Sequence, residues 1–264
     1  MPHRLQHWKN EVYQFISQHA AFKIQKAPEQ PTALISEQLS LYLFEPLEQL
    51  PADFGTERLQ GIHLWKDQWA NQKEIICSRL LSALGITQRI HGRKCKVISI
   101  SNPELINFLE QNHLHTPLRA KIKYGLVYEG ALVAVMAFSH PRQISRNGNI
   151  YKSFELIRHC NKSGYTVVGG FSKLLKHFIQ EKSPDDIMTY VDLEWSKGES
   201  YLQFGFEEVG ISPAQFFYLD QTQEKRIYPH LIGQDGKFVN QQLIDSGFRV
   251  VYNHGNIKLL LKLK

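Results

Sequence analysis

The chain has little cysteine and no long apolar run. Its cysteines, Cys77, Cys95 and Cys160, lie far apart, and no CxxC pair occurs. The sequence therefore indicates neither a disulfide framework nor a thiolate zinc site. No apolar run reaches the roughly 18 residues of a membrane-spanning helix, and the opening MPHRLQHWKNEV is polar where a signal peptide is apolar. We expect a cytoplasmic protein that makes no contact with a membrane.

An excess of positive charge is absent from the first third of the chain. Residues 1–92 hold 9 Lys+Arg and 9 Asp+Glu, so the net charge of +6 comes from residues 93–264. Two clusters stand out there: Arg93, Lys94 and Lys96, and then Arg119, Lys121 and Lys123. Such clusters attract phosphate backbones through counterion release, so we expect nucleic acid to bind here. The alternative is a solvated basic face.

Residues 1–92 show the pattern of a small α/β unit. Apolar spacing predicts a helix over 4–22, strands over 39–44 and 61–65, and a helix over 67–85 that ends at Gly85. This unit is short for an independent catalytic domain.

From residue 95 onward, strands and helices alternate regularly. We predict a strand (95–101), a helix (103–113), a hairpin (121–130 and 131–140), a strand (151–160), a Gly-Gly turn with a helix (166–182), a strand (186–195), and a short helix with a last strand (196–210). This order resembles the GNAT acyltransferase fold. We therefore expect an α/β protein with a GNAT-like splayed mixed sheet flanked by helices. Its parts are the N-terminal unit (1–92), the GNAT-like domain (93–220) and a C-terminal extension packing on it (221–264).

The Gly-Gly turn is the candidate cofactor site. In the GNAT fold the strand before this turn and the strand after its helix splay apart, and the N–H groups at the helix start can bind phosphate. The turn residues are Val168, Gly169, Gly170, Ser172 and Lys173. Close packing is the alternative reason for two glycines. TVVGGFSK lacks the arginine and the spacing of the usual coenzyme A loop, so acyl-coenzyme A, another acyl donor and a nucleic-acid phosphate all stay open as ligands.

Several strings resemble phage-type homing endonucleases that join a Vsr-like nuclease to a C-terminal acyltransferase-like domain. They include IHLWKDQWANQKEIICSRL, YGLVYEGALVAVMAF, VVGGFSKLLKHFI and VDLEWSKGESYLQFGF, and the match runs from roughly residue 60 to the C-terminus. The nuclease half of that family carries paired carboxylates for Mg²⁺. Here the nearest carboxylates are Glu45, Glu48 and Asp67. The resemblance implies that residues 1–92 are a shortened, inactive nuclease relic.

A second resemblance is to the Mom family of phage DNA-modification proteins, which are acyltransferase-like and modify adenine. The shared features are Asn112-His113, Arg158, Asp192, and Gly198 with Tyr201 ahead of Gly205-Phe206. This resemblance implies a catalytic site made of His113, Arg158, Asp192 and Tyr201.

Each of these residues has a chemical role and a structural alternative. Asp192 would serve as a general base or amine anchor, or it would cap the next helix. Tyr201 would protonate a leaving thiolate, or it would pack in the core. Arg158 requires a carboxylate or phosphate partner. One of His113 and His115 would titrate near neutral pH or bind a metal, although two histidines make an incomplete metal site.

Three functions follow from these patterns. The first is an enzyme, a GNAT-like transferase that modifies nucleic acid. The second is a non-catalytic, DNA-binding relative of homing endonucleases, and the third is a small-molecule or peptide N-acyltransferase. The sequence does not indicate the donor, the acceptor or the oligomeric state.

Overall fold

The computed structural model describes residues 6–26, 31–45, 60–220, 225–229 and 242–264. Its contacts divide the chain into two units. The first holds Met1–Ile76, Asp192–Lys197 and Ser212–Asn256, and the second holds Cys77–Val191, Gly198–Ile211 and Ile257–Lys264. Residues 77–92 thus belong with the GNAT-like part, and the chain passes between the units several times.

The first unit contains a mixed four-stranded sheet and helix α1 (His7–Ser17). The sheet has the order β1 (Lys23–Gln25), β2 (Thr32–Ile35), β3 (Ser40–Phe44) and β4 (Ile62–Trp65). Only β3 and β4 pair in parallel. Helix α1 buries Trp8, Val12 and Ile16 at helical spacing. The predicted helix and the strands at 39–44 and 61–65 are confirmed, whereas β1 and β2 were not predicted.

A second, three-stranded sheet in this unit comes from the C-terminal part of the chain. Its order is β15 (Arg226–Ile227), β14 (Phe216–Asp220) and β16 (Phe248–Tyr252), all antiparallel. Its residues Phe217, Leu219 and Val251 form one buried cluster with Phe44 and Trp65 of the first sheet. This shared core joins the two sheets of the first unit.

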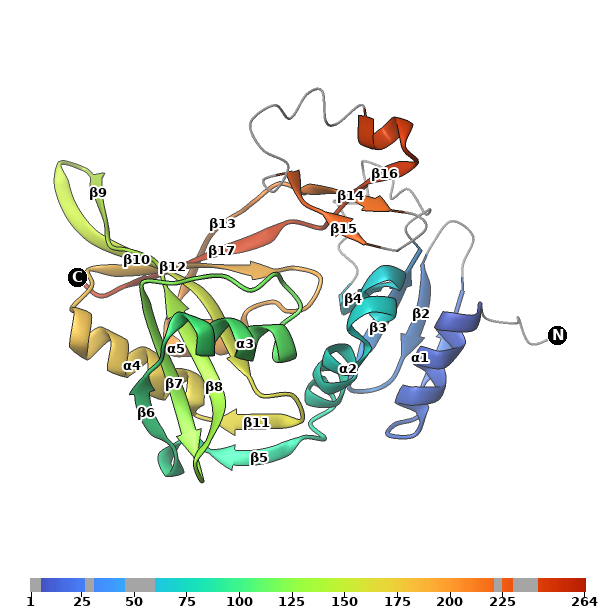
Figure 1. Ribbon diagram of the computed structural model, residues 1–264, viewed down its shortest axis with the longest axis horizontal. Coiled ribbons are helices and arrows are strands. Elements are labelled where there is room, and N and C mark those ends of the chain that lie inside the picture. The colour runs from blue at the N-terminus through green and yellow to red at the C-terminus, as the bar shows by residue number, and fades with distance from the viewer. Residues whose placement is uncertain (1–5, 27–30, 46–59, 221–224, 230–241) are drawn as a thin grey trace. The chain divides into compact units, whose positions relative to one another are not determined.

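The second unit is built on one large sheet (Figure 1). Its strands lie in the order β13 (Glu207–Ile211), β17 (Asn256–Lys262), β12 (Asp186–Asp192), β10 (Asn149–Asn161), β8 (Ala131–Phe138), β7 (Ile122–Tyr128) and β6 (Lys96–Ser99). Helices α3 (Asn102–Asn112), α4 (Gly170–Lys182) and α5 (Glu199–Phe204) lie between strands in sequence. The predicted order of elements is confirmed, and Glu129 and Gly130 form the predicted turn with φ values of 49° and 78°.

The sheet splays between β10 and β12. The two strands pair in parallel only from Ser153 to Leu156 of β10. The pairing of β10 with β8 shifts register between Leu156 and Arg158. Beyond this shift β10 stays paired with β8 but no longer with β12. The Thr189 hydroxyl donates to the Leu156 carbonyl at 2.8 Å at the point of separation. A bulge bends its strand, so the expected splayed mixed sheet has a local physical cause.

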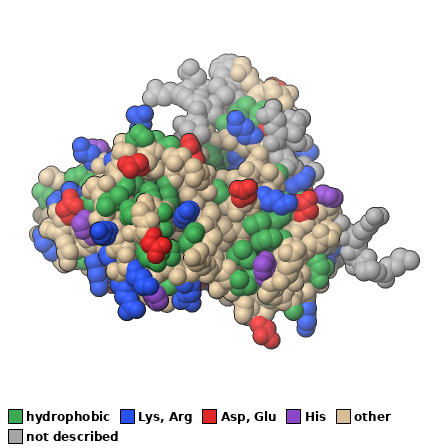
Figure 2. Space-filling view, turned by 60° about the horizontal axis from the view of Figure 1, so that its bottom comes forward, with side chains coloured by type: hydrophobic (Ala, Val, Ile, Leu, Met, Phe, Trp, Pro, Cys, Tyr) green, Lys and Arg blue, Asp and Glu red, His purple; other side chains and the backbone are tan. Residues whose placement is uncertain are grey.

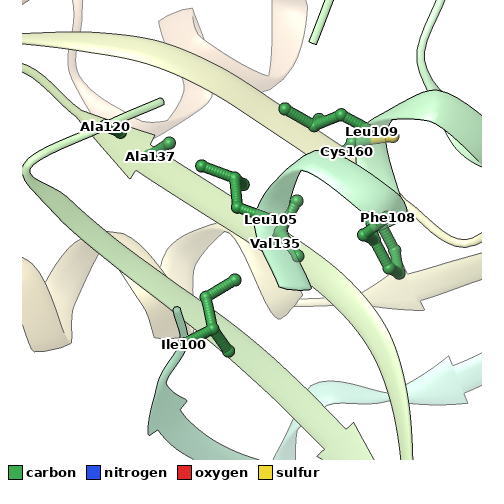
Figure 3. Packing of buried hydrophobic residues seen from close by; sticks show 8 residues of the cluster. All are labelled: Ile100, Leu105, Phe108, Leu109, Ala120, Val135, Ala137 and Cys160. Carbon is green, nitrogen blue, oxygen red and sulfur yellow. The ribbon is translucent and has the colours of Figure 1, made fainter. Parts of the chain in front are cut away.

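Helix α3 covers the sheet beside β8, as Figure 3 shows. Ser101 caps the helix in a capping box with Glu104, which fixes where the helix begins. The buried cluster consists of Ile100, Leu105, Phe108, Leu109, Ala120, Val135, Ala137 and Cys160. Because α3 starts at a fixed cap and packs on this cluster, the loops at both of its ends have defined positions.

Two pairs of strands in the second unit were not predicted. β5 (Gln88–His91) pairs in parallel with β11 (Tyr165–Val168). β9 (Arg142–Arg146) pairs with the start of β10. In the part of the chain that the structure describes, no helix is long and apolar enough to span a membrane.

Candidate functional site

A basic pocket of about 440 Å³ opens in the second unit. Its lining residues are Asn102, Arg119, Ala120, Lys121, Ser139, His140, Arg142 and Ile157. Three of them are Arg or Lys, one is histidine, and none is a carboxylate. A concave surface lined in this way concentrates positive potential and favours an anionic ligand.

One wall of the pocket is held by the start of α3. The Asn102 Oδ1 atom accepts the backbone N–H of Ala120 at 3.1 Å. Arg119 and Lys121 flank Ala120, so this hydrogen bond sets where both basic side chains leave the backbone. The Lys123 ammonium donates to the Ala120 carbonyl at 3.0 Å and therefore supports the loop from outside the pocket. Of the six predicted nucleic-acid-binding residues, Arg119 and Lys121 line the pocket.

The opposite wall follows the end of β8. The Ser139 hydroxyl donates to the His140 carbonyl at 2.8 Å and accepts the Glu155 N–H at 3.0 Å. Arg142, which is largely exposed, lies 3.5 Å from the partly buried Glu155 carboxylate and forms an ion pair with it. We did not predict His140 or Arg142, although the Asn-Gly pair at 147–148 is a hairpin signal that would have placed them beside the sheet.

The other predicted basic residues lie elsewhere in the second unit. Arg93 and Lys94 belong to the short 3-10 helix η1 (Gly92–Lys94), and Lys96 begins β6. All three are exposed, and none lines the pocket. Figure 2 shows Lys and Arg side chains gathered at the lower left of the visible face. Arg93, Lys94 and Lys96 thus add positive charge to the exposed surface of the unit outside the pocket.

His113 ends α3 in a basic environment. Its Nδ1 atom accepts the His115 N–H at 3.0 Å, so the proton of the neutral ring is on Nε2. Burial lowers the pKa of His113 well below its usual value, and the nearby charges of His115, Arg158 and Arg79 lower it further. The structure thus brings Arg158 near His113, together with Arg79, which we did not predict. Burial and these cations favour the neutral ring of His113, and its catalytic role stays a prediction.

Tyr201 lies on α5 in an aromatic cluster. Its ring packs edge-on against Phe171 at 4.8 Å and against Phe206 at 5.6 Å. Burial raises the pKa of Tyr201 to about 12, so the phenol keeps its proton at neutral pH. Phe171 also packs edge-on against His159 of β10, at 5.2 Å. Phe171 therefore bridges β10 and α5 with its ring.

Asp192 belongs to the first unit. Its Oδ1 atom accepts the Glu194 N–H at 2.9 Å, and its carbonyl accepts the N–H groups of Trp195 and Ser196. These bonds close the turn after β12, whereas the next helix begins at Glu199 with Gly198 as its N-cap, so Asp192 does not cap that helix. Its catalytic role stays a prediction.

The Gly-Gly turn is packed against η1. Gly169 adopts φ 73° before the first residue of α4. A Cβ atom on Gly92 would lie 3.1 Å from backbone atoms of Val168, Gly169 and Gly170. The Lys173 ammonium donates to the carbonyls of Gly92 and Cys95, at 3.0 and 2.5 Å.

These contacts leave the turn poorly suited to bind an acyl-coenzyme A. The turn has no arginine, the ammonium of Lys173 is bound to two carbonyls, and Gly92 lies against the turn. The Phe171 ring fills space between β10 and α5. The residues present therefore do not fit the diphosphate of an acyl-coenzyme A. Ser172 is half-buried and Val168 ends β11.

Two of the three carboxylates considered for a nuclease site, those of Glu45 and Asp67, interact with other side chains. Glu45 accepts a hydrogen bond from the Trp8 indole, and Asp67 pairs with the Arg226 guanidinium. Glu48 lies outside the described residues. Among the residues that the structure describes, no group of three or more His, Cys, Asp or Glu side chains is arranged to hold a metal ion. The nuclease resemblance of residues 1–92 stays a prediction.

A buried polar network lies between the two sheets of the first unit. Glu194 accepts the Trp65 indole N–H at 2.9 Å and lies 3.2 Å from the His254 Nδ1 atom. His254 in turn lies 3.3 Å from the Nδ1 atom of His63. Arg226 sits over the Phe217 ring at 4.2 Å. The buried side chains of Glu194 and Arg226 thus have interaction partners, and this offsets the cost of burying their charges in the core.

No protein-family model matches the sequence, and neither does any curated protein. Among solved structures, the chain is similar to the ribosomal-protein-S18-alanine N-acetyltransferase from Escherichia coli, with 13% identity, 64% of this chain and 94% of that chain covered, and a TM-score of 0.40. It is also similar to a GNAT family acetyltransferase from Elizabethkingia anophelis, with 12% identity, 64% and 99% covered, and a TM-score of 0.37. The second unit has a GNAT-like fold, which follows from its own strand order and splay.

Proposed function

We propose that the protein binds nucleic acid through the basic pocket of its GNAT-like unit. The observation that carries this proposal is the lining of the pocket, where Arg119, Lys121, His140 and Arg142 converge and no carboxylate lines the wall. Phosphate groups are the anions that Arg and Lys side chains bind at such surfaces. The exposed Arg93–Lys96 segment would extend the contact along a polyanion.

The distribution of charge supports a polyanion as the ligand. The excess of Lys and Arg lies entirely in residues 93–264. A ligand with many phosphates releases condensed counterions from each contact, so affinity rises with the number of basic residues it meets. A small anion would use the pocket alone, whereas nucleic acid would also use the surrounding basic surface.

Removing two pocket charges tests the proposal. We expect the double substitution Arg119→Ala and Lys121→Ala to weaken binding of labelled nucleic acid about 10- to 100-fold at low salt. The slope of log affinity against log salt concentration should fall by about 2, because two phosphate contacts are lost. Fluorescence anisotropy over a series of salt concentrations measures both quantities.

The matched control is Lys162→Ala with Lys176→Ala. These lysines are exposed, lie in the same unit outside the pocket, and change the net charge by the same amount. The control should bind nearly as tightly as the unaltered protein. Equal losses in both double variants would show that total charge, and not the pocket, determines binding.

A second candidate is covalent modification of the bound nucleic acid. It is favoured by His113 and Tyr201, two neutral, partly buried groups in the basic surroundings of Arg79. The Tyr201 phenol and the Nε2–H group of His113 can both donate to a reacting atom. We expect mass spectrometry to find a new nucleoside in DNA or RNA from expressing cells, and Tyr201→Phe to abolish it. The absence of a new nucleoside, or its persistence in the variant, would remove this candidate.

A further inference from the structure

Tyr190 is an exposed aromatic side chain in the middle of strand β12. Along this strand Ile187, Thr189 and Val191 are buried, whereas Met188 is partly buried and Tyr190 is 44% exposed. Side chains alternate between the two faces of a sheet, so Tyr190 and Met188 share the face opposite to the buried three. The Tyr190 ring therefore stands on a solvent-exposed face of the main sheet.

Helix α4 lies on the other face of the sheet. The Phe178 ring of this helix stacks on Phe138 of β8 at 3.6 Å and packs edge-on against Phe154 of β10 at 5.1 Å. Phe154 pairs with Ile187 in the register of β10 and β12, so the buried side of β12 is the side that faces α4. Tyr190 thus points away from α4.

The basic pocket lies on the same face as Tyr190. Glu155 of β10 is paired with Met188, and the pocket residue Arg142 forms its ion pair with Glu155. Two residues further along the strands come Ile157, which lines the pocket, and Tyr190. The paired part of β10 and β12 ends one residue earlier, and paired strands are about 4.8 Å apart. Tyr190 therefore lies beside the pocket, across the point where the strands begin to separate.

A lysine stands on the other side of Tyr190. β17 is the next strand of the sheet, and the Leu263 N–H donates to the Asp185 carbonyl at 2.9 Å. A second backbone bond near the other end of the two strands fits the same antiparallel register. This register places Lys258 opposite Tyr190, and the Cβ atoms of such a pair lie about 4.5–5.5 Å apart. The ring is thus flanked by the cations of the pocket on one side and by Lys258 on the other.

We propose that Tyr190 is a stacking platform for an unpaired base, and that the ligand of the basic pocket is a single-stranded segment of nucleic acid. The inference rests on the proposed function, because the pocket holds the phosphates that bring the base to the ring. It adds the class of nucleic acid that this site recognises.

The chemistry of this face favours a single strand over a duplex. An aromatic ring beside a positively charged groove is the arrangement with which proteins bind single strands, since each base has a flat face that can stack. In a duplex the faces of the bases are covered by their neighbours, so a ring on a sheet surface meets none of them. A duplex would therefore use the phosphate contacts of the pocket and gain nothing from Tyr190.

Substitution of Tyr190 tests the platform. We expect Tyr190→Ala to weaken binding of a labelled single-stranded DNA of about 12 nucleotides roughly tenfold, with the salt slope unchanged, because the ring contacts no phosphate. Tyr190→Phe keeps the ring and should bind within about twofold of the unaltered protein. Binding of the corresponding duplex should be the same in all three proteins. Tyr252→Ala is the control, since Tyr252 is a 56% exposed tyrosine of the first unit.

A strand without bases gives the matched control on the side of the ligand. An abasic oligonucleotide of the same length keeps every phosphate but offers nothing to stack on. The unaltered protein and Tyr190→Ala should bind it equally. Thermal melting of Tyr190→Ala should match that of the unaltered protein, which separates a lost contact from a damaged fold.

The outcomes separate this inference from the proposed function. If the unaltered protein binds no nucleic acid, the proposed function fails and the platform with it. If the Arg119→Ala, Lys121→Ala variant loses binding and Tyr190→Ala does not, the platform alone is overturned. An equal loss for single strand, duplex and abasic strand overturns it too. So does a change in oligomeric state of Tyr190→Ala on sedimentation without a change in affinity for the single strand, because the ring would then bind a second copy.

Discussion

Replacing Arg226 with alanine is expected to lower the free energy of unfolding by about 3–5 kcal/mol, because it leaves the buried Asp67 carboxylate without its cation. The two side chains are 13% and 3% exposed, and they are joined by two hydrogen bonds. The nearby charges of Asp67 and Glu194 raise the pKa of Arg226, so the guanidinium stays charged at any accessible pH. The variant also loses the contact of the guanidinium with the Phe217 ring. Urea denaturation measures the change.

The double substitution Arg226→Met with Asp67→Leu serves as the control. This double variant removes both members of the ion pair, so neither Asp67 nor Arg226 is left as an unpaired buried charge, and most of the lost stability should return. A loss below about 1 kcal/mol in Arg226→Ala alone would show that the ion pair contributes little to the first unit.

Acid conditions are expected to destabilise the second unit through His159. Burial lowers the pKa of His159 to about 4, compared with its ordinary value of 6.5. Between these two pH values the unfolded chain binds a proton that the folded chain does not bind. The contribution of neutral His159 to the free energy of unfolding is therefore fully present above pH 6.5. It falls as the pH drops toward 4, and about 3 kcal/mol is lost over this range.

Replacing His159 by phenylalanine should flatten this dependence. The new ring would lie beside Phe171, where the imidazole now packs, and it cannot take up a proton. His91→Gln is the matched control, because His91 is an exposed histidine of the same unit. Urea denaturation at several pH values from 4 to 7 would show the difference. An unchanged pH profile in His159→Phe would assign the acid sensitivity to another group.

Much of the second unit could be predicted from the sequence because its elements carry local signals. The Ser101 cap, the turn at Glu129-Gly130 and the glycines before α4 each mark where an element begins or ends. The pairs β5–β11 and β1–β2 could not be predicted, because short strands depend on partners distant in sequence. The pairing of Tyr165 with Gln88 is an example.

The candidate site was only partly predictable for the same reason. Arg119 and Lys121 stand out as a cluster in the sequence, whereas Arg142 joins them only through the hairpin and the sheet. The two glycines at 169–170 resemble a phosphate-binding turn in sequence. In the structure Gly92 packs closely against this turn because it has no Cβ atom, which no local pattern indicates.

Crosslinking of a photoreactive DNA duplex, followed by mass spectrometry of the peptides, tests the central claim most directly. The claim is that phosphates bind where Arg119, Lys121 and Arg142 converge. We predict crosslinked peptides that contain residues 119–121 and 140–150, and their loss in the Arg119→Ala, Lys121→Ala variant. Crosslinks confined to other segments, or unchanged in that variant, would contradict it.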